Sequence, residues 1–167
     1  MNSDIITQYF PELTPRQREQ FEALGALYEE WNARINVVSR KDMEHLYTRH
    51  ILHSLAIAKV CKFEAGARVV DIGCGGGFPL LPLAIVRPDL QLTGLDSTEK
   101  KIRYVEETAK QLDLCITGIS ARAEELAKEE PYRDDSVSPG RLMKNLGQRL
   151  NRDAAVCVDV GQNQIWA

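Results

Sequence analysis

The chain has 167 residues, of which 44% are hydrophobic and 27% charged, and its formal net charge at pH 7 is −3. This length suits one domain with a substantial core, and the composition excludes a chain that is disordered throughout. The slightly acidic balance excludes nucleic-acid binding through overall charge, although a local basic face is compatible with it.

The first third of the chain carries helical patterns. Thr14-Pro15 predicts a helix start, with threonine as the cap and proline at the first helical position. Apolar residues then recur at steps of three and four as far as Trp31, which is the spacing of an amphipathic helix. Two further helical patterns cover residues 43–47 and 51–58. We therefore expect an N-terminal helical region, residues 1–64, packed on a core domain.

From residue 66 onward strands and helices alternate. The β-branched run 68–72 ends at glycines and is typical of a buried parallel strand. The following pattern predicts a helix, a strand, an amphipathic helix and a third strand, over residues 79–86, 91–95, 99–112 and 115–119. This order indicates a parallel α/β sheet with right-handed crossovers. Further along we expect helices over 122–128 and 142–150, and strands over 135–138 and 154–160.

The turn after the first strand carries glycines at alternate positions. Asp71 lies near the end of that strand, and Gly73, Gly75 and Gly77 follow before a helix begins. Glycines allow a sharp turn and let a ligand lie against the main chain. The dinucleotide fingerprint requires a glycine where this chain has Phe78, which disfavours a dinucleotide oxidoreductase. An acidic residue before alternating glycines instead resembles the S-adenosylmethionine loop of class I methyltransferases.

Asp96 strengthens the prediction of a nucleoside site. It ends the second predicted strand, where a carboxylate can accept hydrogen bonds from both ribose hydroxyls. Asp71 would face a cofactor ammonium more favourably than a phosphate, and Phe78 would supply an apolar wall for adenosine. The alternative interpretations are a plain turn for the glycines and a helix cap for Asp96. The two signals together favour cofactor binding.

Several segments between about residues 10 and 130 occur in the order known from one family. They are WN at 31–32 with NVVSR at 36–40, RHILHSL at 49–55, DIGCGGGFP at 71–79, LDS at 95–97 with KK at 100–101, and RAEE at 122–125. The chain thereby resembles the bacterial small-subunit ribosomal RNA guanine-N7 methyltransferases, also called glucose-inhibited division protein B. This combination is far more specific than the glycine loop alone.

The resemblance implies a class I, Rossmann-like fold that transfers a methyl group from S-adenosylmethionine to N7 of a guanine in 16S ribosomal RNA. By motif position it implies cofactor contacts at Gly73, Phe78, Ala123 and Glu124, with Asp96 at the ribose. It also places several polar residues at the cofactor pocket or the RNA: Asn36, Ser39, Arg40, Arg49, His50 and Ser54.

Guanine N7 already carries an in-plane lone pair, so methyl transfer needs positioning more than an obligatory general base. We therefore assign no catalytic residue. His50 and His53 are candidates, but a histidine on a helix near the core more often has a packing role. Four basic residues are candidates for RNA binding, against the alternative of a solvated face with nearby glutamates: Arg40, Arg49, Lys100 and Lys101.

Residues 131–167 depart from the family pattern. The family has a fourth strand followed by Ser-Arg-Ala, whereas this chain reads VSPGR at 137–141, which displaces the arginine by two positions. We therefore expect a core over residues 65–167 whose sheet is incomplete at its C-terminal end. The alternatives are a methyltransferase acting on small molecules or proteins, and a truncated, non-catalytic remnant that binds the cofactor weakly or not at all.

The remaining sequence features concern location and partners. The cysteines show no metal-ligand spacing, so we expect no zinc site and no disulfide framework. No stretch approaches the length of a membrane span and the N-terminus does not resemble a signal peptide. We expect a monomer in the cytoplasm, away from the membrane, whose partner is 16S ribosomal RNA or the small ribosomal subunit.

Overall fold

The computed structural model describes residues 3–122 and 154–158, and these residues form an α/β fold. Its elements in chain order are α1 (Asp4–Tyr9), α2 (Pro15–Asn32), the 3-10 turn η1 (Met43–His45), the π-helix η2 (Leu46–Ile51), α3 (Leu52–Val60), β1 (Arg68–Ile72), α4 (Leu80–Val86), β2 (Gln91–Asp96), α5 (Glu99–Gln111), β3 (Ile116–Ser120) and β4 (Ala154–Val158). The strands pair in parallel in the order β3-β2-β1-β4. That order matches strands 3-2-1-4 of the Rossmann order 3-2-1-4-5-6, so the predicted fold class is confirmed.

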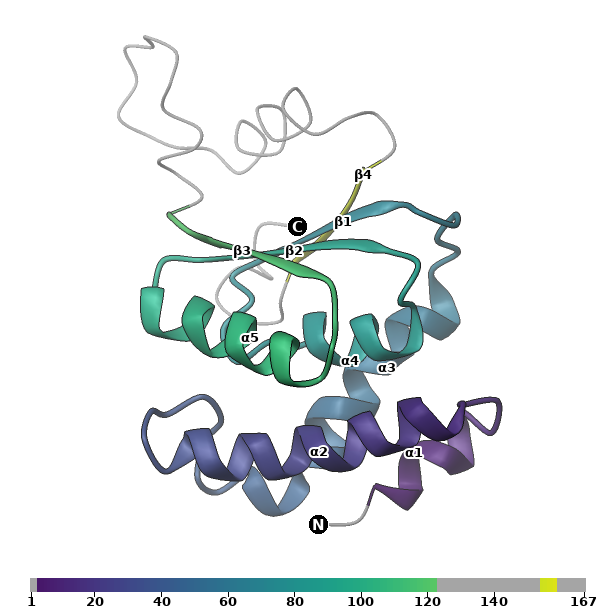
Figure 1. The fold of residues 1–167 in the computed structure, drawn as a ribbon, viewed down its shortest axis with the longest axis horizontal. Coiled ribbons are helices and arrows are strands. Elements are labelled where there is room, and N and C mark those ends of the chain that lie inside the picture. The colour runs from purple at the N-terminus through teal and green to yellow at the C-terminus, as the bar shows by residue number, and fades with distance from the viewer. Residues whose placement is uncertain (1–2, 123–153, 159–167) are drawn as a thin grey trace, which may run out of the picture.

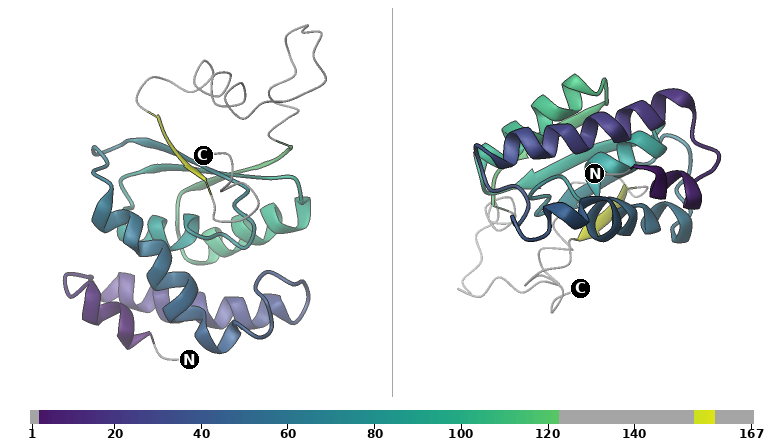
Figure 2. Two further views of the ribbon diagram at one scale, coloured as in Figure 1. Left: turned by 180° about the vertical axis from the view of Figure 1, so that it is seen from behind. Right: turned by 90° about the horizontal axis from the view of Figure 1, so that it is seen from below.

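The elements lie in layers (Figure 1). Helices α4 and α5 lie against one face of the sheet, and α1 and α2 form a further layer beyond them, as the view from behind also shows (Figure 2). The register pairs Asp71 of β1 with Gly94 of β2 and Ile72 with Leu95. The carboxyl ends of β1 and β2 therefore lie side by side, and the loops that follow them meet at one edge of the sheet.

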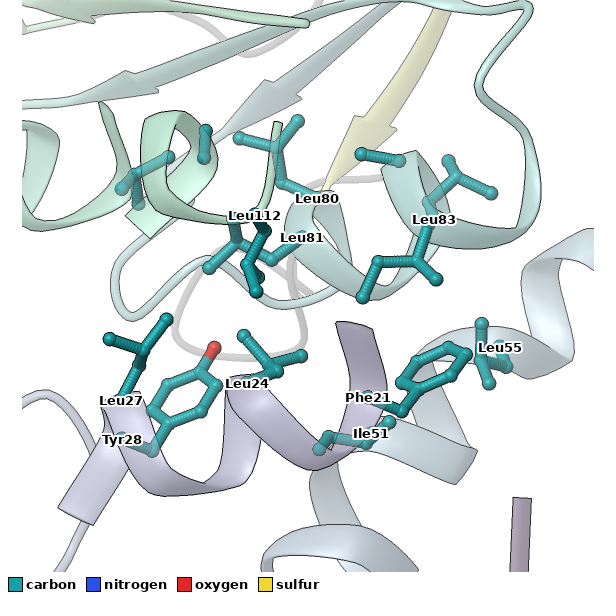
Figure 3. Close-up of a cluster of buried hydrophobic side chains, with 14 of the residues drawn as sticks. Phe21, Leu24, Leu27, Tyr28, Ile51, Leu55, Leu80, Leu81, Leu83 and Leu112 are labelled. Atoms are coloured by element: carbon teal, nitrogen blue, oxygen red, sulfur yellow. The ribbon is translucent and has the colours of Figure 1, made fainter. Parts of the chain in front are cut away.

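One apolar core joins the N-terminal helices to the sheet. Phe21, Leu24 and Tyr28 of α2 are buried and face Leu81 and Leu83 of α4 (Figure 3). Burial of each such side chain contributes roughly 1.5–3 kcal/mol. Two glutamine amides add polar contacts across the same interface, because Gln17 donates to the Ile85 carbonyl at 2.8 Å and Gln20 donates to the Leu112 carbonyl at 2.7 Å.

The element predictions hold most closely where the pattern is strong. The first strand has the predicted bounds, the second extends to Asp96, and the third is displaced by one residue. The pattern over 43–47 predicted a separate helix, but η1 and η2 run into α3 without a break. A strand also forms within the predicted range 154–160. The elements expected over 122–128, 135–138 and 142–150 extend into or lie within the residues outside the described ranges.

The start of α2 is a capping box, which allows a direct test. The Thr14 hydroxyl accepts from the Gln17 amide at 3.2 Å, the Gln17 side chain accepts from the Thr14 amide at 2.9 Å, and Pro15 follows. We expect Thr14→Ala to lower the free energy of unfolding by about 1 kcal/mol, measured by urea denaturation. Thr7→Ala is the control, because its exposed hydroxyl only donates to the Asp4 carbonyl. Equal losses in the two variants would contradict the assigned cap.

Candidate cofactor site

The glycine loop lies directly against the end of β2. The amides of Gly73 and Cys74 both donate to the Leu95 carbonyl, at 2.7 and 3.0 Å. Gly73, Gly75 and Gly77 have φ angles of 81°, 50° and 83°. Side chains other than glycine rarely adopt these conformations. The alternating glycines are thus explained by the backbone path of the turn.

The glycines of this loop also differ in their surroundings. Among the residues that the structure describes, a Cβ added to Gly75 would meet only the Gly73 carbonyl, at an ordinary 3.7 Å, so this part of the loop borders open space there. A Cβ on Gly76 would lie 2.6 Å from the Val37 carbonyl oxygen, which leaves no room for a side chain. The alternating pattern did not single out Gly76. Glycine is required at position 76 because of Val37, which lies about forty residues earlier in the chain, so no local sequence signal could have revealed this requirement.

Asp96 joins the ends of β1 and β2. One carboxylate oxygen accepts from the Gly75 amide at 3.0 Å, and the other accepts from the Thr98 amide at 2.8 Å. The N-cap of α5 is Thr98, so Asp96 is not the helix cap of the alternative interpretation. Asp96 is only partly buried. Because each carboxylate oxygen has a second lone pair, both oxygens can still accept hydrogen bonds from a ligand diol.

Asp71 and Cys74 lie in the interior beside the loop. Each side chain is only 1% exposed. Burial raises the pKa of the Cys74 thiol well above its ordinary value, and the negative charges of Asp71 and Asp96 raise it further. The thiol therefore stays protonated at neutral pH, which makes it a poor nucleophile.

Phe78 connects the loop to the N-terminal helices. Its ring is stacked on Tyr28, with centroids 4.8 Å apart and an interplanar angle of 7°. His50, in the π-helix η2, contacts the same ring at 5.2 Å, and the Ser54 hydroxyl donates to the His50 carbonyl at 2.6 Å. His50 thus packs against the loop, whereas His53 is exposed on α3. Tyr28 is one of the apolar residues that recur at helical spacing before Trp31, and that pattern indicates burial but not this contact with the loop.

The candidate RNA-binding residues lie on two separate elements. Arg40 and Arg49 are exposed in the segment before α3, and the Arg49 guanidinium lies 3.4 Å from the Asp42 carboxylate. Lys100 is exposed and Lys101 half-buried in the first turn of α5, close in sequence to Asp96. Arg40 lines a cavity of about 460 Å³ with other polar and basic residues, among them Arg34, Asn36, Ser39 and Lys41.

Two predicted cofactor residues, Ala123 and Glu124, lie outside the described residues. Within residues 3–122 and 154–158, no group of three or more His, Cys, Asp or Glu side chains is placed to hold a metal ion. No helix in this part of the chain is both long and apolar enough to cross a membrane.

Comparison with known proteins assigns the family. The family model GidB, described as rRNA small subunit methyltransferase G, matches residues 17–138. Ribosomal RNA small subunit methyltransferase G of Flavobacterium psychrophilum is 48% identical over 141 residues, which cover 84% of this chain and 66% of that protein. The protein of the same name from Bacteroides thetaiotaomicron is 54% identical over 123 residues, which cover 73% of this chain and 60% of that protein.

The chain thus spans no more than two thirds of the length of these relatives. Likeness to solved structures is weaker. Precorrin 8W decarboxylase of Methanobacterium thermoautotrophicum reaches a TM-score of 0.49 at 18% identity, over 68% of this chain and 65% of that one. The assignment therefore rests on the sequence matches, which agree with the resemblance noted from the motifs: the chain belongs to the rRNA small subunit methyltransferase G (GidB) family.

Proposed function

We propose that the chain is an S-adenosylmethionine-dependent methyltransferase that methylates N7 of a guanine in 16S ribosomal RNA. The observation that carries the proposal is the Asp96 carboxylate held against the Gly75 amide, at the open side of a glycine loop. That arrangement places a carboxylate, which can accept hydrogen bonds from both ribose hydroxyls, beside glycine main chain that a ligand can approach closely. A nucleoside cofactor requires both features. The family name supports ribosomal RNA of the small subunit as the substrate. We further propose that the protein acts as a monomer in the cytoplasm.

The described residues fit the proposed cofactor. Gly75 leaves space for a ligand against the backbone, and Asp96 keeps lone pairs for the ribose hydroxyls. The buried charge of Asp71 would attract the cofactor's cationic groups through a medium that screens poorly. The Phe78 ring, which is only half-buried, would contact the adenine. We propose these cofactor-binding residues: Asp71, Gly73, Gly75, Gly77, Phe78, Asp96, Ala123 and Glu124.

The proposed reaction requires little acid–base catalysis from this chain. The cofactor, when bound, supplies a methyl group on a positively charged sulfonium. Guanine N7 needs no deprotonation, so the protein residues have to orient the base in line and exclude other nucleophiles. The Cys74 thiol of the loop is buried and stays protonated, so it does not compete with the guanine for the methyl group. We assign no general base.

Methyl transfer to RNA tests the proposal. Purified chain, tritiated S-adenosylmethionine and either deproteinised 16S RNA or 30S particles should give labelled 7-methylguanosine in at least one substrate. Gly73→Val is the control, because a branched side chain rarely adopts φ of 81°. Cofactor binding without transfer would favour the alternative of a non-catalytic remnant. Failure of a folded chain to bind the cofactor would overturn the proposal.

The proposed RNA contacts predict a salt effect that depends on position along α5. Lys100 lies in the first turn of this helix, four residues after Asp96, and Lys110 lies in its last turn. Both side chains are exposed. If Lys100 contacts a phosphate, Lys100→Ala should reduce the slope of log K against log salt by about 0.9, whereas Lys110→Ala should leave it unchanged. Filter binding of a 16S RNA fragment at several salt concentrations measures both slopes, and equal slopes would remove Lys100 from the interface.

The proposed contacts of Arg40, Arg49 and Lys101 predict the same kind of effect. Arg49 should show the smallest change, because its guanidinium already lies 3.4 Å from the Asp42 carboxylate.

A further inference from the structure

Tyr28 makes two contacts with the glycine loop from outside the sheet. Its hydroxyl donates to the Gly76 carbonyl at 2.6 Å, and its ring stacks on Phe78 at 4.8 Å. The side chain is fully buried and points from α2 into the core (Figure 3). Burial, with the nearby Tyr104, raises the pKa of Tyr28 well above its ordinary value, so the hydroxyl stays protonated and can donate.

The Gly76 carbonyl belongs to the peptide that enters the most constrained glycine of the loop. Gly77 has φ of 83°, and its amide donates to the Cys74 carbonyl at 2.7 Å. Rotation of the peptide between Gly76 and Gly77 would break that turn and displace Phe78. A hydrogen bond on the half-buried Gly76 carbonyl opposes this rotation, because rotation would exchange that bond for incomplete solvation.

A second contact from the N-terminal part of the chain lies close to the same glycine. The Val37 carbonyl approaches Gly76 so closely that a Cβ there would lie 2.6 Å from it. Asn32, the last residue of α2, shapes this segment, since its side-chain oxygen accepts from the amides of Val37 and Val38 at 2.9 and 3.0 Å. The loop is thus bounded on one side by α2 and by the segment that α2 organises.

We propose that Tyr28 is a positioning residue of the cofactor site, which holds the Gly76–Gly77 peptide and Phe78 in the geometry that binds S-adenosylmethionine. This inference rests on the proposed function and adds a determinant from the N-terminal helices. Cofactor affinity then depends on how α2 is docked, because a loop that is ordered beforehand loses less entropy on binding.

Tyr28→Phe tests the role of the hydroxyl, because it keeps the stacked ring and removes the hydrogen bond to Gly76 together with the contact between the Tyr28 and Tyr104 hydroxyls. Tyr47→Phe is the matched control. Tyr47 is also buried among the N-terminal helices, and its hydroxyl donates to the Phe21 carbonyl at 2.8 Å, away from the loop. Burial likewise raises the pKa of Tyr47 to about 12, so both hydroxyls are donors. The two variants should lower the midpoint of thermal unfolding by similar amounts.

The first readout needs no cofactor. Amide hydrogen exchange in a peptide covering residues 73–81 should be about fivefold faster in Tyr28→Phe than in the wild type, and unchanged in Tyr47→Phe. Exchange in β2 and α5 should match the wild type in both variants. Equal exchange of the loop in the two variants would overturn the positioning role, whether or not the chain binds the cofactor.

The second readout is calorimetric titration with S-adenosylmethionine. The Kd should rise about fivefold in Tyr28→Phe and stay within twofold of the wild type in Tyr47→Phe. A wild-type chain that fails to bind would overturn the proposed function, a result distinct from the exchange measurement. Binding by Tyr28→Phe with wild-type affinity would overturn the inference while leaving the proposed function standing.

Discussion

Replacing Asp96 with alanine is expected to weaken binding of S-adenosylmethionine by about 100-fold. The carboxylate accepts from the Gly75 and Thr98 amides at 3.0 and 2.8 Å, and it is the proposed acceptor for the ribose hydroxyls. Hydrogen bonds to an ionised group contribute about 1.5–3 kcal/mol each. Alanine removes the ligand contacts and also releases the Gly75 amide from the end of β2, so affinity falls through both routes.

The test of this prediction is calorimetric titration at a temperature where both proteins are folded. Asp89→Ala is the matched control, because Asp89 precedes the same strand at its opposite end and pairs with Arg87 at 2.8 Å. That variant should bind like the wild type. Asp96→Asn should fall between the two, since an amide keeps one acceptor oxygen. Unchanged affinity in Asp96→Ala would remove this residue from the site.

The second large effect is expected at Gly77 and concerns stability. Gly77 has φ of 83°, and an added Cβ would lie 2.5 Å from the Leu81 Cδ1 atom and 3.3 Å from the Val105 Cγ2 atom. The left-handed conformation costs a residue with a side chain about 1–2 kcal/mol, and overpacking adds about 1–3 kcal/mol. We therefore expect Gly77→Ala to lower the free energy of unfolding by about 3 kcal/mol.

Gly66→Ala separates these two contributions. Gly66 has a similar φ of 76°, but no atom of residues 3–122 or 154–158 lies within 4 Å of a Cβ placed there. Gly66→Ala should therefore lower the free energy of unfolding only by the cost of the left-handed conformation, about 1 kcal/mol. Urea denaturation of both variants gives the comparison. If the two losses are the same, the interior around Leu81 has room for a methyl group and the close packing of the loop is not a determinant of stability.

Much of the architecture follows from local sequence. The β-branched run at 68–72 predicted β1 with its observed bounds, and Thr14-Pro15 predicted the start of α2. Both depend on interactions within a few residues, namely the extended preference of branched side chains and a cap that satisfies nearby amides. The alternating glycines predicted a sharp turn, and all three have positive φ angles in the structure.

The environment of the glycine loop, by contrast, depends on residues distant in the chain. Periodicity identifies Tyr28 as a buried position of α2, but the same pattern would result from any apolar side chain there. Its hydroxyl donates to the carbonyl of Gly76, which lies 48 residues later in the chain. The need for glycine at position 76 likewise arises from a distant residue, Val37. The continuous run of η1, η2 and α3 also contradicts the separate helices that the sequence pattern predicted.

The sequence alone therefore predicted the order β1, α4, β2, α5 and β3, the glycine turn and the family. The tertiary structure decided which side chains hold that turn in place and which carboxylate oxygen meets the Gly75 amide. The physical reason is that hydrophobic periodicity and capping report on neighbours along the chain, whereas a hydrogen bond such as that between Tyr28 and Gly76 forms only after α2 has docked on the core.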